Sequence, residues 1–383
     1  MTYDFDVIVV GARVAGAPTA MLLAGQGHRV LLVDRATMPS DTVSTHAITR
    51  SGVVQLSRWG LEGAVAEMTA PVREVVLGFD DERVRFDVRL EHGVDTFYAP
   101  RRHYLDGLLV DSAVEAGAEF VGGSRVTDLV WSGGEVCGVV AEGDRISARM
   151  VIGADGVWSK VASLVGASDL HRHEPMNAVS YAYYTGIDFP GFWFQFTSGV
   201  NAGLINTSDG EVCVFAGRPA DEFERFRLDP EAEFDHLLAR AGADLYEIVG
   251  AGTRVSSFRG TPGLPGFIRR AWGPGWALVG DAGYTKDPIS AHGISDAFRD
   301  AELCARAVHR SLIDPSNASE AMRAFQRERD RLSWTVLRQS ESLAAYGWGG
   351  SEASRRMRAI SELVKQESTA LCSLPEWPAA AYV

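Results

Sequence analysis

Lysine is scarce in this chain of 383 residues, and its basic residues nowhere form a block. Arginine supplies 34 of the 37 basic side chains, and the lysines are Lys160, Lys286 and Lys365. With a formal net charge of −13, the chain lacks the broad basic surface that tracks the phosphates of nucleic acid. Nucleic-acid binding is therefore not expected, and an anionic ligand would have to be held by a local arrangement of donors.

Cysteines and long apolar stretches are also few. The four cysteines are far apart and form no CxxC pair, so we expect neither a disulfide framework nor a metal site. No stretch of about 18 or more consecutive apolar residues is present, and the chain begins with a strand pattern instead of a charged and then apolar leader. These absences predict a cytoplasmic protein without a membrane span, whose state as a monomer or homodimer stays open.

Residues 6–35 have the pattern of a strand, a glycine turn, a helix and a second strand, which together form a βαβ unit. The turn GARVAG is close to a dinucleotide-binding fingerprint. In that fingerprint Gly11 makes the sharp turn, and Gly16 lets the helix pack closely on the strand. Asp34, 18 residues after Gly16, is placed to accept hydrogen bonds from ribose hydroxyls.

Arg13 stands where the fingerprint has its middle glycine. The first helix still offers free N–H groups and the positive end of its dipole to a phosphate, so we expect nucleotide binding to survive the substitution. Arg13 should then lie near the pyrophosphate or its entrance. The alternative is a glycine-rich turn without a ligand, but strand, turn, helix and terminal acid all agree with nucleotide binding.

Two further glycine-acid turns follow apolar strands later in the chain. Residues 101–120 predict an amphipathic helix that leads into a strand, and antiparallel strands then end at the turn of Asp155 and Gly156. Near residue 280 another strand ends at Gly280 and Asp281, before a proline loop and a long helix from about Gly293.

With these three turns in this order, the chain resembles the flavoprotein monooxygenases of the para-hydroxybenzoate hydroxylase class, the single-component or group A FAD enzymes. The resemblance covers residues 1–165 and about 272–310. It implies an α/β fold, with a GR2-type Rossmann-like FAD-binding domain, a β-sheet substrate domain and C-terminal helices. The expected FAD-binding parts are 1–75, 101–170 and 271–315, the substrate domain comprises 76–100 and 171–270, and 316–383 form a helical segment.

The resemblance also implies which residues hold FAD. The first motif would hold the ADP half, the second turn would lie near the pyrophosphate, and the third would meet the ribityl chain. Backbone N–H groups at the start of the long helix would stabilise negative charge on the reduced flavin ring. The implied set is Gly11, Ala12, Arg13, Val14, Ala15, Gly16, Asp34, Arg35, Ser44, Thr45, Arg102, Val126, Asp155, Gly156, Gly280, Asp281, Pro288, Gly293, Ile294 and Ser295.

The chain departs from the family pattern at positions that bear on nicotinamide contacts. Tyr284 ends GDAGY where members usually have GDAAH, residues 288–293 replace PxxGxG, and Ala162 stands where an arginine is frequent. The catalytic residues stay unassigned. His46 and His292 are candidates for contact with flavin or substrate, with loop solvation or a local hydrogen bond as the alternative.

Residues 171–270 contain no further dinucleotide turn. Polar and aromatic residues alternate there between glycine turns, which predicts a sheet with one face toward a cavity. Core packing is the alternative for about half of the aromatics. The candidates for the substrate pocket are Tyr181, Tyr183, Phe192, Phe194 and Phe196, with Trp193 beside them. After residue 315, two charged helices separated by GWGG are expected, as a brace or a dimer face.

The implied function is oxygen insertion. In the resembled family, NADH or NADPH is the transient reductant of FAD, O₂ is taken up as a flavin C4a-hydroperoxide, and an aromatic or polyketide-like small molecule receives one oxygen atom. Three alternatives stay open. A flavin-dependent halogenase would need a lysine between flavin and substrate, and no lysine precedes Lys160. GFWFQF faintly resembles a geranylgeranyl reductase, and a non-catalytic flavin-bound protein would present its surface to a partner.

Overall fold

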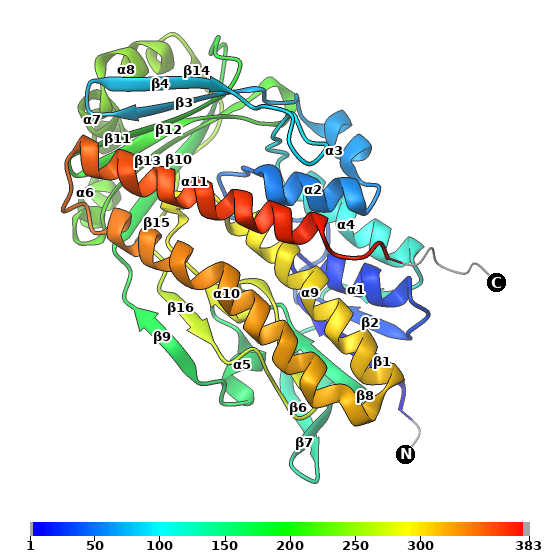
Figure 1. Cartoon of the computed structure of the whole chain (residues 1–383). Coiled ribbons are helices and arrows are strands. Elements are labelled where there is room, and N and C mark those ends of the chain that lie inside the picture. The colour runs from blue at the N-terminus through cyan, green and yellow to red at the C-terminus, as the bar shows by residue number, and fades with distance from the viewer. Residues whose placement is uncertain (1–2, 378–383) are drawn as a thin grey trace.

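The computed structural model describes residues 3–377, which form three β-sheets with long helices at the C-terminal end (Figure 1). The first sheet is at the lower right of Figure 1, and the second is at the upper left. None of the helices in this described range is long and apolar enough to cross a membrane.

The first sheet contains the strands that precede the three glycine turns. Its central strands are parallel and buried on both faces, as their β-branched apolar sequences predict. Val10 of β1 pairs with Gly153 of β8, and Leu278 of β18 pairs with the same glycine. The carboxyl ends of three strands therefore meet at one sheet edge. The strands are β1 (Phe5–Val10), β2 (Val30–Val33), β5 (Glu119–Val121), β6 (Val126–Ser132), β7 (Glu135–Ala141), β8 (Asp144–Gly153), β17 (Trp272–Gly273) and β18 (Trp276–Leu278).

Helices pack against this sheet and against one another around one large apolar core. Every residue of α1 is buried, because α4 and α9 cover the side of α1 that turns away from the sheet. α9 begins at Gly293, as the sequence predicts. The helices of this part are α1 (Gly16–Ala24), α2 (Arg50–Arg58), α3 (Glu62–Met68), α4 (Arg102–Glu115), α5 (Lys160–Leu164) and α9 (Gly293–Ile313).

The two faces of the second sheet pack against different parts of the molecule. Side chains alternate along β11, so that Trp193 packs under helices α7 and α8, whereas Phe192 and Phe194 turn to the opposite face. Its strands are β3 (Glu74–Phe79), β4 (Glu82–Asp87), β10 (Asn177–Thr185), β11 (Phe192–Thr197), β12 (Val200–Asn206), β13 (Val212–Pro219), β14 (Thr253–Arg254) and β15 (Arg259–Thr261). Its helices are α6 (Phe223–Leu228), α7 (Pro230–Ala241) and α8 (Ala243–Gly250).

Early and late segments of the chain complete the molecule. β3 pairs in parallel with β11, so a segment near residue 75 joins the sheet of the later domain. A third, small sheet contains β9 (Asp169–His173), β16 (Gly266–Arg269) and β19 (Tyr284–Thr285). Short 3₁₀ turns are η1 (Ser208–Gly210), η2 (Ala220–Glu222), η3 (Gly280–Ala282), η4 (Pro288–Ser290) and η5 (Pro315–Asn317).

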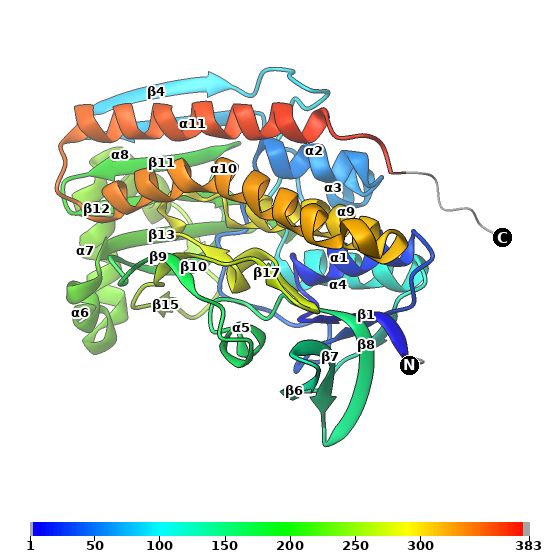
Figure 2. The same cartoon turned by 60° about the horizontal axis from the view of Figure 1, so that its bottom comes forward.

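The two predicted C-terminal helices are present as α10 (Ala318–Ala344) and α11 (Gly350–Cys372). Figures 1 and 2 show α11 extending from the second sheet to α2, and α10 lying along α9. The GWGG link is not a loose connection, because Trp348 is buried and donates a hydrogen bond to the Leu343 carbonyl. The predicted α/β fold with C-terminal helices is confirmed.

Candidate FAD site

The first glycine turn is closed so tightly that side chains are excluded at two positions. A Cβ atom on Gly11 would lie 2.4 Å from the Ala154 carbonyl oxygen, and Gly11 has a φ of +104°. A Cβ atom on Gly16 would lie 1.8 Å from the Gly11 carbonyl oxygen. Both positions therefore require glycine, and the start of α1 lies directly against the turn.

Asp34 lies at the end of β2, next to this turn. One carboxylate oxygen accepts a hydrogen bond from the Ala12 N–H at 2.7 Å, and the other accepts one from the Ala36 N–H at 2.8 Å. These bonds hold the carboxylate beside the amino-terminal end of α1. The position fits the expected role in binding ribose hydroxyls, since a carboxylate oxygen can accept more than one hydrogen bond.

Arg13 is held in place by hydrogen bonds to neighbouring side chains. Its guanidinium donates to a carboxylate oxygen of Asp106 at 2.7 Å and to the Ser40 hydroxyl at 2.9 Å. Arg102 of α4 binds both oxygens of the same Asp106, at 3.1 and 3.2 Å. Asp106 is fully buried, so one carboxylate fixes two arginines side by side. The sequence did not indicate Asp106.

The carboxylate of Asp155 in the second turn binds the first residues of helix α5. Asp155 accepts hydrogen bonds from the Ser159 hydroxyl and from the N–H groups of Lys160 and Val161, which start α5. Burial raises the pKa of Asp155, although these hydrogen bonds oppose the rise. The carboxylate is therefore occupied within its own turn. What the turn offers toward Gly11 is its backbone, because the Asp155 N atom is 3.0 Å from where a Gly11 Cβ would stand.

The third turn places an accessible acid among buried neighbours. Gly280 and Ala282 are buried, whereas Asp281 between them is exposed. A Cβ atom on Gly280 would lie 2.7 Å from Cβ of Ala15, so this turn closes against the start of α1. Crowding by the surrounding protein raises the pKa of Asp281, and Lys286 and Arg102 partly offset that rise.

Helix α9 begins beside the third turn. Gly293 is exposed, and the residues on either side of it are buried, so the N-terminal backbone is accessible at this point. Ile294 and Ser295 follow in the first turn, where N–H groups have no partner inside the helix. His292 precedes them and is almost completely buried. An exposed glycine at a helix N-terminus next to an accessible acid fits the ring and ribityl portions of FAD.

The first turns of α9 adjoin a buried ionic network that sequence reasoning missed. The guanidinium of Arg299 contacts a carboxylate oxygen of Asp296 at 2.8 Å, of Asp300 at 2.7 Å and of Glu367 at 2.9 Å. Lys286 also pairs with Asp296. Glu367 comes from α11, in a charged helix whose pattern alone indicates only a solvated face.

This network contains three groups that are close enough to hold a metal ion: His292, Asp296 and Glu367. Both acids are already paired with Arg299, and Lys286 adds a second cation beside Asp296. Burial and the nearby Arg299 lower the pKa of Lys286 to about 7. Arg299 already occupies an oxygen of each acid and repels a divalent ion, so the arrangement fits an ionic core better than a metal centre.

The aromatic residues expected to line the substrate pocket lie on the face of the second sheet that turns to the FAD-binding part. We call this group the aromatic wall. Tyr181, Tyr183 and Phe192 are buried there, with Phe194 beside them, in one apolar cluster that also contains Ala47 and Ala291. Ala291 immediately precedes His292, so this face approaches the start of α9. Phe196 differs, because it stacks on Phe79 at 5.6 Å and packs with Trp348 under the C-terminal helices.

His46 is part of this aromatic wall. Its Nε2 atom lies 2.6 Å from the Tyr183 hydroxyl, and Nδ1 is buried without a hydrogen-bond partner within residues 3–377. Burial lowers its pKa to about 3, and Arg102 and Arg101 act in the same direction, so the ring is neutral near pH 7. His46 also has a φ of +70°, which is rare for a residue with a side chain.

Arg101 also belongs to this wall, and the sequence did not indicate it. Its guanidinium lies 3.7 Å from the centre of the Tyr183 ring and pairs with Glu211 and Asp41. Asp41 also binds Arg259 at 2.9 Å. Asp41 belongs to the segment that precedes His46, so two arginines of different elements tie this segment to the wall.

The remaining predicted contacts have different surroundings. The Ser44 N–H lies 3.4 Å from the Tyr181 hydroxyl, and Thr45 next to it is partly buried. Val126 begins β6 and is buried in the core under the first sheet. Arg35 is exposed, and Pro288 starts the short turn η4. Val14, like Arg13, is partly buried in the first turn.

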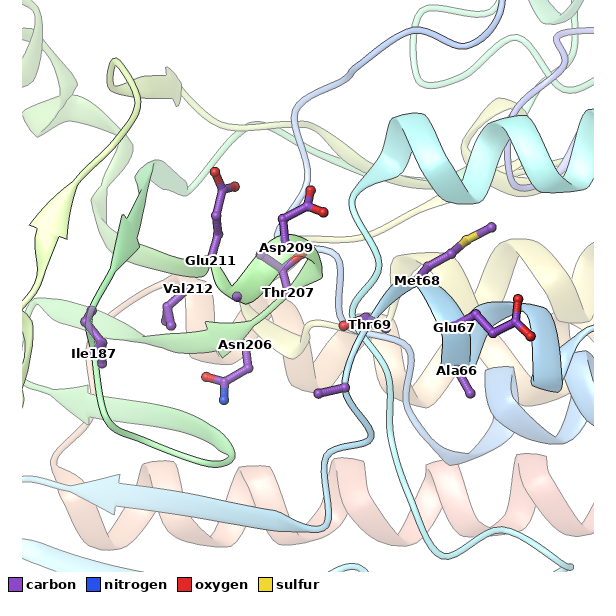
Figure 3. Close-up of a pocket in the computed structure, with 12 residues that line it drawn as sticks. Ala66, Glu67, Met68, Thr69, Ile187, Asn206, Thr207, Asp209, Glu211 and Val212 are labelled. Atoms are coloured by element: carbon purple, nitrogen blue, oxygen red, sulfur yellow. The ribbon is translucent and has the colours of Figure 1, made fainter.

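A pocket of about 340 Å³ lies away from all three turns (Figure 3). Figure 3 shows Glu67 and Thr69 from the end of α3 on one side, and Asp209 and Glu211 from the hairpin between β12 and β13 on the other. The pocket lining contains none of the residues predicted to bind FAD or substrate. It is lined by Ala66, Glu67, Met68, Thr69, Ala70, Ile187, Asn206, Thr207, Asp209, Gly210, Glu211 and Val212.

Comparison with protein families agrees with the three turns. Residues 4–225 match the family described as FAD binding domain, and this range is more than half of the chain. The chain belongs to this FAD-binding family, and its cofactor is FAD.

Two curated relatives differ in how much of the chain they match. The chain is 32% identical to protein FixC of Escherichia coli O157:H7 over 226 residues, which cover 57% of this chain and 50% of FixC. It thus spans half the length of that relative. It is 25% identical to the digeranylgeranylglycerophospholipid reductase of Methanocella arvoryzae over 341 residues, which cover 86% of this chain and 83% of the reductase.

Solved structures share the fold over nearly the whole chain. PqsL of Pseudomonas aeruginosa, a probable FAD-dependent monooxygenase, has a TM-score of 0.79 and 22% identity, and the match covers 94% of this chain and 99% of PqsL. The myxobacterial chondrochloren halogenase CndH has a TM-score of 0.78 and 22% identity, covering 95% and 90%. These similarities establish an FAD-dependent oxidoreductase fold that is common to more than one reaction.

Proposed function

We propose that this protein is an NADH- or NADPH-dependent FAD monooxygenase that inserts one oxygen atom from O₂ into an aromatic or polyketide-like small molecule. The observation that carries the proposal is the single cluster formed by Tyr181, Tyr183, Phe192 and the loop residue Ala291. This cluster supports the proposal because its aromatic side chains pack against Ala291, two residues before the start of α9. An apolar wall facing a flavin ring suits a flat, apolar substrate.

Three parts of the protein would have distinct roles in this reaction: the start of α9, the aromatic wall and His46. The N–H groups at the start of α9 would stabilise negative charge on the flavin ring, because the helix dipole is positive there. Bound FAD would supply electron transfer and the activation of O₂. The aromatic wall would exclude water and orient the substrate. His46 would contact a polar group of the substrate through Nδ1, while Tyr183 fixes its other nitrogen.

Halogenation is the less suitable reaction, although the CndH fold is closely similar. The resembled halogenases rely on a lysine between flavin and substrate. Lys160 and Lys365 of this chain are exposed, and Lys286 is buried and paired with Asp296. None of the three belongs to the aromatic cluster. The side chain required for that chemistry is therefore missing from the wall.

Reduction of a prenyl double bond is the second candidate. It is favoured by the similarity to the digeranylgeranylglycerophospholipid reductase, which extends over most of both chains. Such a reaction would use the same FAD site and an apolar wall, but it would add hydrogen to the substrate and consume no O₂. Product mass therefore separates the two proposals.

The test begins with the purified FAD-loaded protein under anaerobic conditions. NADH or NADPH is added in the presence of each of a panel of phenols and polyketides, and the loss of flavin absorbance is followed. Oxygen is then admitted, and products are analysed by mass spectrometry. We expect substrate-stimulated reduction and a product that gains one oxygen atom. Saturation of a digeranylgeranyl lipid without O₂ uptake would favour the reductase instead.

A further inference from the structure

His292 lies at the meeting point of α2, α9 and α11, just before the accessible start of α9. Its Nε2 atom lies 3.1 Å from a carboxylate oxygen of Glu367 on α11, and its Nδ1 atom lies 2.8 Å from the Thr49 hydroxyl at the start of α2. The Thr49 hydroxyl in turn lies 3.3 Å from the hydroxyl of Ser295 in the first turn of α9. These contacts form one continuous chain of hydrogen bonds from α11 to the start of α9.

The charges around His292 decide which of its nitrogens carries the proton. Burial acts to raise the pKa of Glu367, but Arg299 and His292 outweigh this effect and hold it well below its ordinary value. Glu367 is therefore ionised and can only accept hydrogen bonds. Burial lowers the pKa of His292, and the attraction of Glu367 offsets this only in part. Near pH 7 His292 is thus neutral, with one N–H group.

These two protonation states decide which group donates and which accepts in each hydrogen bond of this series. Glu367, which only accepts, is closer to Nε2 at 3.1 Å than the Ser51 hydroxyl at 3.4 Å, so the single proton of His292 is on Nε2 and Nδ1 is left as an acceptor. The Thr49 hydroxyl then donates to Nδ1, which leaves its oxygen free to accept from the Ser295 hydroxyl. Ser295 consequently directs its proton to Thr49, on the side of α9 that packs against α2.

We propose that Glu367 is a positioning residue that fixes the tautomer of His292 and thereby orients the hydroxyl groups of Thr49 and Ser295 at the flavin-ring end of the site. The inference rests on the proposed placement of the flavin ring at the start of α9. It deepens that proposal by giving the C-terminal helix a defined part in the site. Because the Ser295 side chain is fully buried, the backbone N–H groups at the exposed Gly293 are the donors to the ring, and the hydroxyl dipoles lie behind them.

The change that tests this orientation is Glu367→Gln. The amide NH₂ of glutamine can donate to Nε2 of His292, which moves the histidine proton to Nδ1 and reverses the chain. The Ser295 hydroxyl, which is fully buried beside α2, then accepts from Thr49 instead of donating to it. Glu362→Gln is the matched control, because Glu362 is exposed on the same helix and loses the same charge.

The first readout is the tautomer itself. Nitrogen-15 NMR of protein labelled at histidine distinguishes a protonated Nε2 from a protonated Nδ1, and the spectrum of His292→Asn identifies the His292 signals. We expect Nε2–H in the wild type and in Glu362→Gln, and Nδ1–H in Glu367→Gln. If His292 keeps its proton on Nε2 in Glu367→Gln, the proposal is wrong.

The second readout is the affinity of the oxidised FAD-loaded protein for sulfite, which increases when negative charge on the flavin ring is better stabilised. Loss of the buried negative charge of Glu367, together with the reversed hydroxyl dipoles, should tighten sulfite binding about tenfold in Glu367→Gln. Thr49→Val removes the acceptor that draws the Ser295 hydroxyl dipole toward α2, so it should tighten binding in the same direction, by less, without disturbing Glu367. Thr49 makes no side-chain cap on α2, so this variant spares the helix.

Thr49→Val keeps the proposal testable if Glu367→Gln does not fold. Sulfite affinity equal to wild type in the folded variants would overturn the proposed orientation. Sulfite affinity within about twofold of wild type in Glu362→Gln is expected, because an exposed charge is screened. Oxygen insertion is measured separately on the wild type with substrate, so failure of the monooxygenase proposal and failure of this one are distinguishable.

Discussion

The two ends of the candidate FAD site are built in different ways. At the nucleotide end, comprising the Gly11 to Gly16 turn and Asp34, residues close in sequence shape backbone groups around a glycine turn. At the ring end, comprising residues 286–295 with Thr49 and Glu367, buried charges from separate helices hold the start of α9. The first end depends on close backbone approach, and the second depends on long-range ion pairing.

Gly16→Val should break the nucleotide end outright and has the largest expected effect. The added Cβ atom would overlap the Gly11 carbonyl oxygen, so α1 cannot keep its place against the turn. We expect loss of bound FAD, measured by flavin absorbance after gel filtration. Gly63→Ala is the control, since Gly63 of α3 has open space where a Cβ atom would stand. A Gly16→Val protein with a full complement of FAD would show that the turn is not the binding element.

Arg299→Met should break the ring end through stability. It removes the cation shared by Asp296, Asp300 and Glu367 and leaves buried carboxylates uncompensated. The free energy of unfolding should fall by about 3–5 kcal/mol, measured by urea denaturation. Arg323→Met removes an exposed arginine of α10 and should change it by less than about 0.5 kcal/mol. Equal effects would mean that the network contributes no more than a surface pair.

Tyr183→Phe should lower catalytic activity without affecting the binding of FAD. It removes the partner of His46 and leaves both ring nitrogens free, so the histidine is no longer fixed toward the substrate. We expect kcat/KM to fall about tenfold or more, with FAD retained. Tyr184→Phe, on the opposite face of the same strand, should leave kcat/KM unchanged. Loss of FAD in Tyr183→Phe would contradict this separation.

Asp287→Asn should reduce the pH dependence of the free energy of unfolding, because this acid at the ring end titrates in the wild type. Burial raises the pKa of Asp287 to about 7, although hydrogen bonds from Asn177 and from the Ile289 N–H oppose the rise. The folded protein therefore binds a proton that the unfolded chain has lost between about pH 4 and 7, and the stability from this proton disappears as the pH rises through that window. Asparagine lacks the titration.

Urea unfolding of the wild type and of Asp287→Asn at about pH 5 and about pH 8 measures this effect. We expect the wild type to lose about 2–3 kcal/mol more than the variant between these two pH values. Parallel stability curves would mean that Asp287 is ionised in the folded state.

Arg13→Gly should have the smallest effect, because Arg13 supports the nucleotide end from its margin. Arg102 still binds Asp106 in this variant, and the glycine turn is unchanged. FAD should stay bound, with an affinity reduced by no more than about tenfold in a fluorescence titration. A loss as complete as that of Gly16→Val would place Arg13 among the essential phosphate contacts.

The accuracy of the sequence predictions follows the same division. The βαβ unit, the helix starting at Gly293 and the two C-terminal helices were predictable, because apolar periodicity and glycine turns are local signals. Alternation puts Trp193 on the face opposite Phe192, Phe194 and Phe196, but which face is covered by helices depends on what packs against the sheet. Phe196 shares the face of Phe192 and lies farther along the strand, under the C-terminal helices that only the fold brings there. Nor could the sequence show that Arg13 pairs with Asp106, 93 residues later.

By itself, the sequence determined the FAD-binding fold, because three glycine-acid turns after buried strands admit few other backbones. It also placed Asp34 and Gly293, whose positions follow from where a strand ends and a helix begins. Only the tertiary structure decided that Glu367 reaches His292, and that Arg101 covers Tyr183. Such pairings join residues far apart in the chain, and their energies arise only after folding has removed the charges from water.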